Sequence, residues 1–453
     1  MGKLPGPRTP LGHVRWGRRL TKDLYDGLWA LYQEFGPVVD LGYGPLRWVY
    51  LFGQEANELI LAGRPEAFRW RDAFQVLEVV NGPTAITLSD GEEHRRRRRL
   101  VQPAFHKRRI DSQLDLIVEE IDRTIDGWKP DQRIDVYQDL RVTIRRIVIR
   151  ALFGDRLSER AEELGARLRR PLAYIQRQPP RFDINLPGFE YRRVLGDMAQ
   201  ADEIVYGEIA RRRAETGTQD PGIDVLDMLL ASQDEDGSGL TDQEVRDQVM
   251  SLIAAGYDTT SAGAAWAVYD VIRHPAVWDR AVAEVAEVVG DRPLRSEDIP
   301  QLHYLDRVVH EVLRVHSPAV LSARRAVEEV ELHGLRIPAR RMVIYSAYVT
   351  HRMPELWPEP DVFRPERWET EPEPYTWVPF GGGYRRCLGF ALALLEIKVV
   401  LVQVLRRTRL QLDRTDIRPT GMATSYPNGG VPATVSPKRS VKASLPIYVG
   451  KLK

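Results

Sequence analysis

The sequence predicts a mainly helical single domain with small β-sheets. Three observations support this fold class: a long helical segment at residues 241–272, an apolar helical run that starts at Phe390, and only a few extended segments. Thr241 and Glu244 form a capping-box pattern at the start of the long segment, and Pro275 follows its end. A helix of roughly 30 residues is ~45 Å long, which is enough to cross a whole domain.

The extended segments are few and short. Residues 37–52 alternate between apolar and polar around a Gly/Pro turn, which predicts a β-hairpin. Residues 330–337 and 342–349 form a second extended region. No Gly/Pro-rich loop is long enough to link independent domains, so we expect one domain over residues 1–453, with residues 440–453 as a loosely held tail.

The composition is that of an ordinary globular protein, with 43% hydrophobic and 28% charged residues. The 65 basic and 64 acidic side chains nearly cancel, so we expect no global attraction to nucleic acid or to anionic lipid. One cysteine excludes an internal disulfide and any multi-cysteine metal site. Without a signal-peptide core or a run of ~18 uncharged apolar residues, we expect a cytoplasmic protein that has no membrane anchor.

The single cysteine lies in a glycine-rich loop, residues 380–389, that reads Phe-Gly-Gly-Gly-Tyr-Arg-Arg-Cys-Leu-Gly and leads into the apolar helical run. The glycines allow positive φ and close approach of the backbone to a flat ligand. Cys387 stands at the mouth of a helix, where the dipole favours a thiolate by only ~0.3–1 kcal/mol, so a metal must supply most of the deprotonation. The alternative is a lone buried cysteine that acts as a small hydrophobe. The flanking glycines and two adjacent arginines favour the metal ligand.

The long helix contains an unusual segment at mid-length, Ala-Gly-Tyr-Asp-Thr-Thr at residues 255–260. Glycine costs a helix roughly 1 kcal/mol relative to alanine, and threonine can bond back to the preceding turn, so the helix is locally weak around Asp258. The segment is either a tolerated kink against a crowded neighbour or a functional site.

Two further patterns involve charge. Glu311 and Arg314 are spaced i, i+3 on one helical face, although most such pairs are solvated and contribute only ~0.2–0.5 kcal/mol. Five consecutive arginines follow His94. At 100° per residue, His94 and Arg98 share one side of a helix, whereas Arg95, Arg96 and Arg99 point elsewhere.

In this context Phe380, Gly383, Arg385, Cys387 and Gly389 match the cysteine-loop signature of the cytochrome P450 superfamily, and the chain resembles its soluble bacterial members. The resemblance implies that haem b (iron protoporphyrin IX) is the cofactor and that the Cys387 thiolate is the axial ligand of its iron. It also implies that Arg385 reaches a haem propionate.

The resemblance assigns roles to the other patterns. Ala255 and Gly256 would leave room for dioxygen, while Thr259 and Asp258 would deliver protons to it. The expected haem contacts are His94, Arg98, Ala255, Gly256, Arg324, Phe380, Gly383, Arg385, Cys387 and Gly389; Arg325, next to Arg324, makes that register ambiguous. Glu311, Arg314 and Arg367 would form a buried structural cluster. The substrate-pocket candidates are Phe74, Leu77, Ile86, Ala254, Ala255, Val320 and Leu321, and those for docking of the electron donor are Arg95, Arg99 and Arg386.

From this resemblance we expect a haem-thiolate monooxygenase of secondary metabolism that inserts one oxygen atom from O₂ into a lipid, terpenoid or polyketide by hydroxylation or epoxidation. Electrons would come from a separate ferredoxin or flavodoxin with its reductase, and the enzyme would be a monomer. The alternatives are a haem-thiolate peroxygenase or isomerase, which typically lacks the acid–alcohol pair, and a non-enzymatic haem sensor.

Overall fold

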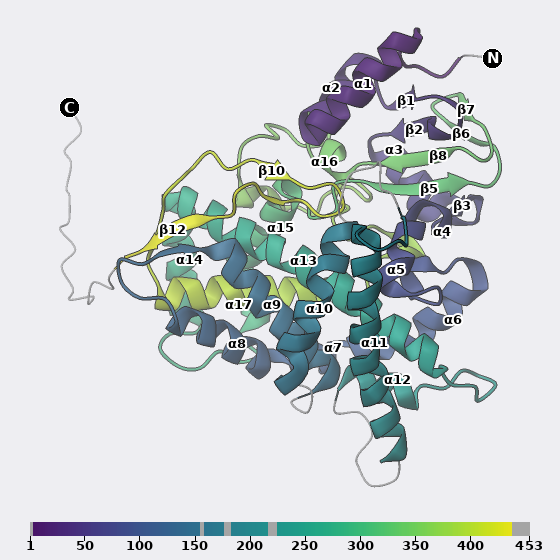
Figure 1. The fold of residues 1–453 in the computed structure, drawn as a ribbon. Helices are drawn as coiled ribbons and strands as arrows, with labels where there is room; N and C mark the ends of the chain where they lie inside the picture. Colours follow the sequence, from purple (N-terminus) through teal and green to yellow (C-terminus); the bar gives the residue numbers. More distant parts are fainter. Residues whose placement is uncertain (1–2, 155–157, 176–182, 216–223, 437–453) are drawn as a thin grey trace, which may run out of the picture.

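The computed structural model describes residues 3–154, 158–175, 183–215 and 224–436. Figure 1 shows a large helical body, with a small sheet region to its upper right and α1 and α2 at the outer edge. The mainly helical fold class is therefore confirmed. The expected tail at residues 440–453 lies outside the described residues.

The helices are α1 (Pro10–Lys22), α2 (Leu24–Phe35), α3 (Gln54–Glu58), α4 (Arg71–Phe74), α5 (Glu78–Asn81), α6 (Gly91–Val101), α7 (Lys107–Asp111), α8 (Leu114–Asp126), α9 (Val136–Phe153), α10 (Ser158–Ile175), α11 (Glu190–Ala214), α12 (Val225–Ala231), α13 (Asp242–Arg273), α14 (Pro275–Val288), α15 (His303–Val315), α16 (Ala347–Thr350) and α17 (Phe390–Arg407). Among the described residues, none of these helices has the length and apolarity needed to cross a bilayer.

The strands are β1 (Val38–Leu41), β2 (Trp48–Leu51), β3 (Phe68–Arg69), β4 (Arg133–Asp135), β5 (Ser322–Ala326), β6 (Val330–Leu332), β7 (Leu335–Ile337), β8 (Met342–Tyr345), β9 (Leu410–Leu412), β10 (Pro419–Thr420), β11 (Tyr426–Pro427) and β12 (Pro432–Val435). The largest sheet has the order β1-β2-β8-β5-β3. Its β1–β2 hairpin pairs Val38 with Leu51, as the pattern at residues 37–52 predicts.

The longest helix, α13, begins as predicted. Thr241 accepts a hydrogen bond from the backbone of Glu244 and the Glu244 side chain accepts one from the backbone of Thr241, so the capping box is complete. The helix packs against α9 on one side and α17 on another. Because it is enclosed by these neighbours, its middle can present residues to the interior from several faces.

The extended prediction for residues 342–349 is only half right. Met342–Tyr345 forms β8, but the chain then turns into α16. Ser346 explains the change, because its hydroxyl accepts a hydrogen bond from the backbone N–H of Val349 and donates one to the carbonyl of Val320. A serine in this position caps a helix, and this capping overrides the β propensity of the apolar residues that follow.

Candidate active site

Cys387 lies in the loop between a short helix, η10 (Gly383–Arg385), and α17. Its backbone N–H donates to the carbonyl of Phe380 over 2.9 Å, which closes the loop. The cysteine has an exposed surface, yet protein atoms surround it closely enough that burial raises the pKa of its thiol. The N–H of Gly389 and the charges of Arg98 and Arg386 oppose that rise without overcoming it.

Gly383 is required by the close packing of two backbone segments. Its φ is +58°, and a Cβ there would collide with the carbonyl oxygen of Leu61. Leu61 belongs to a short helical segment, η2 (Leu59–Gly63), that packs against η10. The positive φ expected in this glycine-rich loop is present, and at Gly383 it permits a close approach between two protein segments.

The arginines expected to bind the cofactor converge near this loop. Arg98 on α6 donates to the carbonyl of Arg386 over 2.9 Å, and its charge acts on Cys387. Arg385 donates to Asp90 over 2.6 Å. Arg324 on β5 places its Cζ 3.6 Å from the centre of the Trp70 ring, and the Cζ of Arg385 lies 5.5 Å from the same ring. The thiol and these cations therefore belong to one site.

Buried donors in this site have unmet hydrogen-bonding capacity. Among the described residues, His94 Nδ1 and Trp70 Nε1 are buried without a hydrogen-bond partner. Burial, then the charges of Arg385 and Arg98, lower the pKa of His94 to about 3, so its ring is neutral at neutral pH. Arg324 has no carboxylate partner in the described part of the chain, and burial lowers its pKa to about 10. Buried polar groups are normally paired, so this set of donors fits an anionic ligand.

The two adjacent arginines of strand β5 point to opposite faces of the sheet. Arg324 is 4% exposed and faces inward, whereas Arg325 points to the surface and pairs with Asp72 over 2.9 Å. Successive side chains on a strand point to opposite faces, so only one of the two can reach the interior site.

On α13, Ala255 and Thr259 lie one turn apart on the same face. Ala255 is exposed although it lies at the middle of an enclosed helix, and Thr259 is half-buried. The Thr259 hydroxyl donates to the carbonyl of Ala255 over 2.7 Å. Ala254 is half-buried beside them. A small side chain and a hydroxyl therefore share one accessible stretch of the helix.

Asp258 and Gly256 face the neighbouring helix instead. A carboxylate oxygen of Asp258 lies 3.0 Å from Nη2 of Arg141 on α9, and Asp258 is 4% exposed. A Cβ on Gly256 would meet Val148 of α9. The structure thus separates the segment at residues 255–260 into an accessible face and a face packed on α9.

The predicted structural cluster is brought together completely. Glu311 is fully buried and accepts hydrogen bonds from Nε and Nη2 of Arg314, both at 2.9 Å, and from Nε of Arg367 at 2.9 Å. Trp368 Nε1 and the backbone N–H of Arg364 also donate to it. Two of these five hydrogen bonds lie within α15, and the other three join α15 to the segment that precedes the cysteine loop.

The substrate-pocket candidates differ in burial. Phe74, Leu77 and Leu321 are half-buried, and the Phe74 ring stacks on Trp70 at 4.5 Å. Ile86 is 7% exposed. Val320 is fully buried in the core beneath α1 and α2, so it has no surface through which to contact a substrate in this structure.

The docking candidates are all exposed, but two are already paired. Arg95 pairs with Glu92 over 2.9 Å, and Arg99 lies 3.2 Å from Asp234. Arg386 has no acidic partner among the described residues, and its guanidinium lies over the Phe390 ring at 3.9 Å. The uncompensated positive charge of this group therefore comes mainly from Arg386.

Sequence reasoning missed three residues of the site. Trp70 stacks with the buried arginine of β5, Arg141 holds Asp258, and Glu396 on α17 accepts a hydrogen bond from Thr260 on α13 while its Oε1 has no partner. The Glu396 position could have been noticed, because a carboxylate interrupts an otherwise apolar helical run. Nothing in the sequence singles out Trp70 or Arg141.

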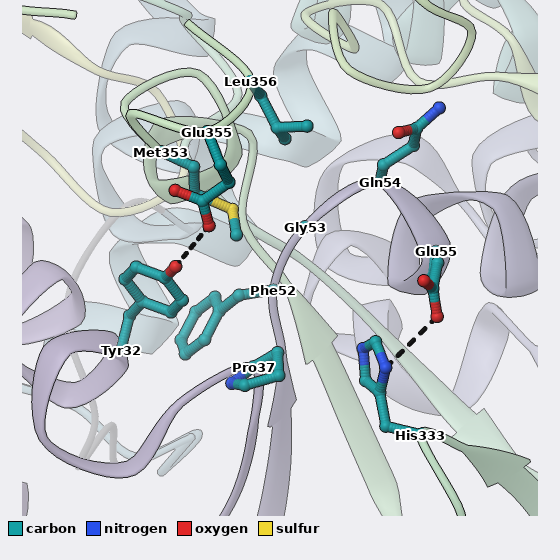
Figure 2. A pocket seen from close by; sticks show the side chains of 10 residues that line it. All are labelled: Tyr32, Pro37, Phe52, Gly53, Gln54, Glu55, His333, Met353, Glu355 and Leu356. Carbon is teal, nitrogen blue, oxygen red and sulfur yellow. Dashed lines mark hydrogen bonds and ion pairs between the residues drawn. The ribbon is translucent and has the colours of Figure 1, made fainter. Parts of the chain in front are cut away.

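A separate surface pocket of about 290 Å³ lies in the sheet region (Figure 2). Its polar groups largely satisfy each other: Tyr32 donates to Glu355 over 2.6 Å, and His333 pairs with Glu55 over 3.1 Å. None of its lining residues belongs to the cysteine loop or to α13, so it is not part of the candidate active site.

Comparison with known sequences gives one consistent family. The model of the cytochrome P450 family matches residues 3–431. A putative cytochrome P450 139 of Mycobacterium tuberculosis (strain ATCC 25618 / H37Rv) is 41% identical over 434 residues, which cover 93% of this chain and 99% of that protein. The cyclooctat-9-en-7-ol 5-monooxygenase of Streptomyces melanosporofaciens is 31% identical, over 90% of this chain and 89% of that protein.

Solved structures agree with the fold. A cyanobacterial cytochrome P450 with bound retinoic acid superposes with a TM-score of 0.81 and 25% identity, over 89% of this chain and 92% of that one. The haem domain of cytochrome P450DA superposes with a TM-score of 0.85 over 97% of this chain and 98% of that one; at 23% identity it is similar in fold alone.

Proposed function

Because the chain belongs to the cytochrome P450 family of monooxygenases, we propose that it inserts one oxygen atom from O₂ into an apolar organic substrate, by hydroxylation or epoxidation. The observation that carries the proposal is the pairing of an accessible single cysteine with buried cationic and N–H donors that have no carboxylate partner among the described residues. That combination would offer iron a sulfur ligand, which the metal itself would deprotonate, and would offer partners to the carboxylates of a porphyrin.

The cofactor we propose is haem b. Cys387 would ligate its iron, and the donors of His94, Arg98, Arg324 and Arg385 would bind its propionates. The unpaired Nε1 of Trp70 adds a fifth donor to this set. A thiolate ligand would donate electron density to the iron and so would favour cleavage of the O–O bond. Bound haem would supply the iron at which O₂ is reduced and split, with one atom passing to the substrate and the other to water.

The chain's own residues would manage the protons. The Thr259 hydroxyl is held by the carbonyl of Ala255 and keeps its oxygen free to accept a hydrogen bond from water on the accessible face. Asp258 is positioned by Arg141, whose side chain is 32% exposed and so connects the buried carboxylate to the solvent. The Asp258 carboxylate would take up a proton from solvent water on the α9 side and, on rotating away from Arg141, would pass that proton towards the Thr259 hydroxyl and become a carboxylate again.

For the substrate we propose a lipid, terpenoid or polyketide skeleton. The candidate lining residues Phe74, Leu77, Ile86, Ala254 and Leu321 are apolar, so they would position such a skeleton mainly by excluding water. A relative is named for oxidation of cyclooctat-9-en-7-ol, another is named cyclooctatin synthase, and a structural neighbour holds retinoic acid. All three names support an apolar organic substrate.

Electrons would come from a separate ferredoxin or flavodoxin with its reductase. Arg386 lies directly beside Cys387 in the loop and is not neutralised by an acid among the described residues. An acidic donor would therefore meet positive charge close to the iron ligand, which chiefly raises the rate of encounter.

Three measurements test the proposal. The reduced, CO-bound protein should give a thiolate-type spectrum, which distinguishes it from a sensor with a histidine ligand. A spectral binding screen over lipids, terpenoids and polyketides should identify ligands that displace water from the iron. Turnover of such a ligand under ¹⁸O₂ with reductant should place one labelled oxygen atom in the product. Activity with peroxide but none with O₂ and reductant would favour the peroxygenase instead.

A further inference from the structure

Exposed apolar side chains gather on α1 and on the turn between β1 and β2. Leu11 and Val14 of α1 are 77% and 48% exposed, and Tyr43 and Leu46 of the turn are 46% and 68% exposed. They account for four of the ten large apolar side chains that are exposed among the described residues. Single exposed apolar residues need no explanation, but a group of them indicates a contact surface.

The two elements form one continuous surface. The backbone N–H of Gly42 donates to Nδ1 of His13 over 3.1 Å, and the rings of His13 and Tyr43 meet edge to face at 4.7 Å. Figure 1 places α1 at the outer edge of the molecule, next to the strands that carry the turn. We call these four exposed apolar residues, together with the basic residues described next, the α1 surface.

The outward side of α1 is also strongly basic. Its exposed residues follow the spacing of one helical face, and the opposite side is buried through Trp16 and Leu20. The exposed face consists of Leu11, Val14, Arg15, Arg18 and Lys22. Lys3 and Arg8 precede it and are exposed as well.

Most of this positive charge is uncompensated. Arg19 pairs with Asp26 over 2.9 Å and Arg47 pairs with Asp40, so the charges of these two arginines are neutralised within the protein. The remaining five cations, Lys3, Arg8, Arg15, Arg18 and Lys22, have no acidic partner in the described part of the chain. Asp23, which follows α1 directly, caps α2 by accepting hydrogen bonds from the backbone N–H groups of Tyr25 and Asp26.

We propose that the α1 surface docks the protein on an anionic phospholipid bilayer. Apolar side chains set among unpaired cations are the pattern of a helix that lies in the interface, with the apolar groups below the headgroups and the cations among them. An acidic protein or a nucleic acid would account for the cations, but it would leave Leu11, Val14 and Leu46 without a role. Because the net charge of the whole chain is only +1, the attraction to the bilayer comes from the α1 surface alone. Salt screens this attraction beyond a Debye length of ~8 Å.

The inference does not depend on the proposed function. No residue of the α1 surface belongs to the candidate active site, and lipid binding can be measured without turnover. The docking would be peripheral, since no described helix has the length and apolarity to cross the bilayer.

Vesicle flotation of the full, haem-loaded chain tests the proposal. We expect binding to phosphatidylcholine vesicles that contain roughly one third phosphatidylglycerol, and little binding to phosphatidylcholine alone. Each cation contributes about fivefold to the affinity for an anionic surface, so Arg15→Gln combined with Arg18→Gln should weaken binding roughly 30-fold at low salt. That difference should shrink as salt is raised, because screening removes the contribution of the cations from both proteins.

Leu11→Ser combined with Leu46→Ser should weaken binding at every salt concentration. The matched control changes an exposed arginine of α11 and an exposed valine elsewhere, Arg193→Gln with Val362→Ser, and should bind as the wild type does. Because all these side chains are exposed, we expect the unfolding midpoint of each variant to stay close to that of the wild type.

Three outcomes would overturn the proposal. The first is wild-type protein that fails to bind the anionic vesicles or binds both kinds equally. The second is a control variant that loses as much affinity as the α1 variants. The third is protein that does not bind the vesicles but binds a purified acidic electron donor through the α1 surface, or forms a dimer through it as measured by light scattering.

Discussion

Removal of the Glu311 carboxylate should destabilise the protein by a large part of its total stability. The carboxylate is fully buried and joins Arg314, Arg367, Trp368 and the backbone of Arg364 through five hydrogen bonds. Burial alone would raise the pKa of Glu311, but the hydrogen bonds and charge of Arg314 hold it below its usual value. The group is therefore ionised in the folded protein and is the only carboxylate that Arg314 contacts among the described residues.

In the Glu311→Ala variant, Arg314 would remain a fully buried cation with no counter-charge, and the Arg367 side chain, 6% exposed, would be nearly so. Breaking a buried pair in this way costs ~3–5 kcal/mol, compared with ~5–15 kcal/mol for the whole stability of a typical domain. We expect a large fall in the urea midpoint and little haem-loaded protein in the soluble fraction.

Glu92→Ala is the matched control, because Glu92 and Arg95 have the same i, i+3 spacing but are 70% and 62% exposed. An exposed pair of this kind contributes only ~0.2–0.5 kcal/mol. The measurement is urea unfolding of both variants and the wild type, followed by fluorescence. If Glu311→Ala unfolds at the same urea concentration as Glu92→Ala, the cluster does not stabilise the fold and the reasoning fails.

Three further predictions concern the site. Cys387→His should abolish the thiolate-type CO spectrum and product formation; a variant that keeps both would mean that another residue ligates the iron. Thr259→Ala should load haem normally and consume O₂ and reductant, but divert them to peroxide, so an unchanged product yield per electron would remove Thr259 from proton delivery. Burial raises the pKa of Glu396 from 4.5 to about 8, so the folded protein keeps this group protonated where the unfolded chain ionises it. As the pH rises from ~4.5 to 8, the free energy of unfolding should therefore fall by up to ~1.4 kcal/mol per pH unit. In the Glu396→Gln variant, unfolding measured against pH should no longer show this slope.

The parts of the fold that the sequence predicted well are determined locally. The α13 boundaries follow from a capping box at one end and a proline beyond the other, and the β1–β2 hairpin follows from alternation around a turn. The α16 helix was missed because its cause is a single serine, whose hydroxyl bonds to a carbonyl 26 residues earlier in the chain. Long-range hydrogen bonds of this kind leave no periodic pattern.

The candidate site could be predicted as a set of residues but not as a geometry. The cysteine loop and the acid–alcohol pair were found from their order in the chain, yet Asp258 and Thr259 face different neighbours. Helical periodicity alone indicates a separation of 100° between adjacent residues. What it could not indicate is that Arg141, 117 residues earlier, stands opposite Asp258.

The buried donors around Cys387 link the site to the stability of the fold. Arg324, His94 and Trp70 all leave polar atoms or charge in the interior without a carboxylate or hydrogen-bond partner among the described residues, and each such group lowers stability. A ligand with two carboxylates relieves that cost only in the folded state, so its binding must stabilise folding. The buried donors that indicate the site therefore also predict that the protein gains stability when the group that pairs with them is bound.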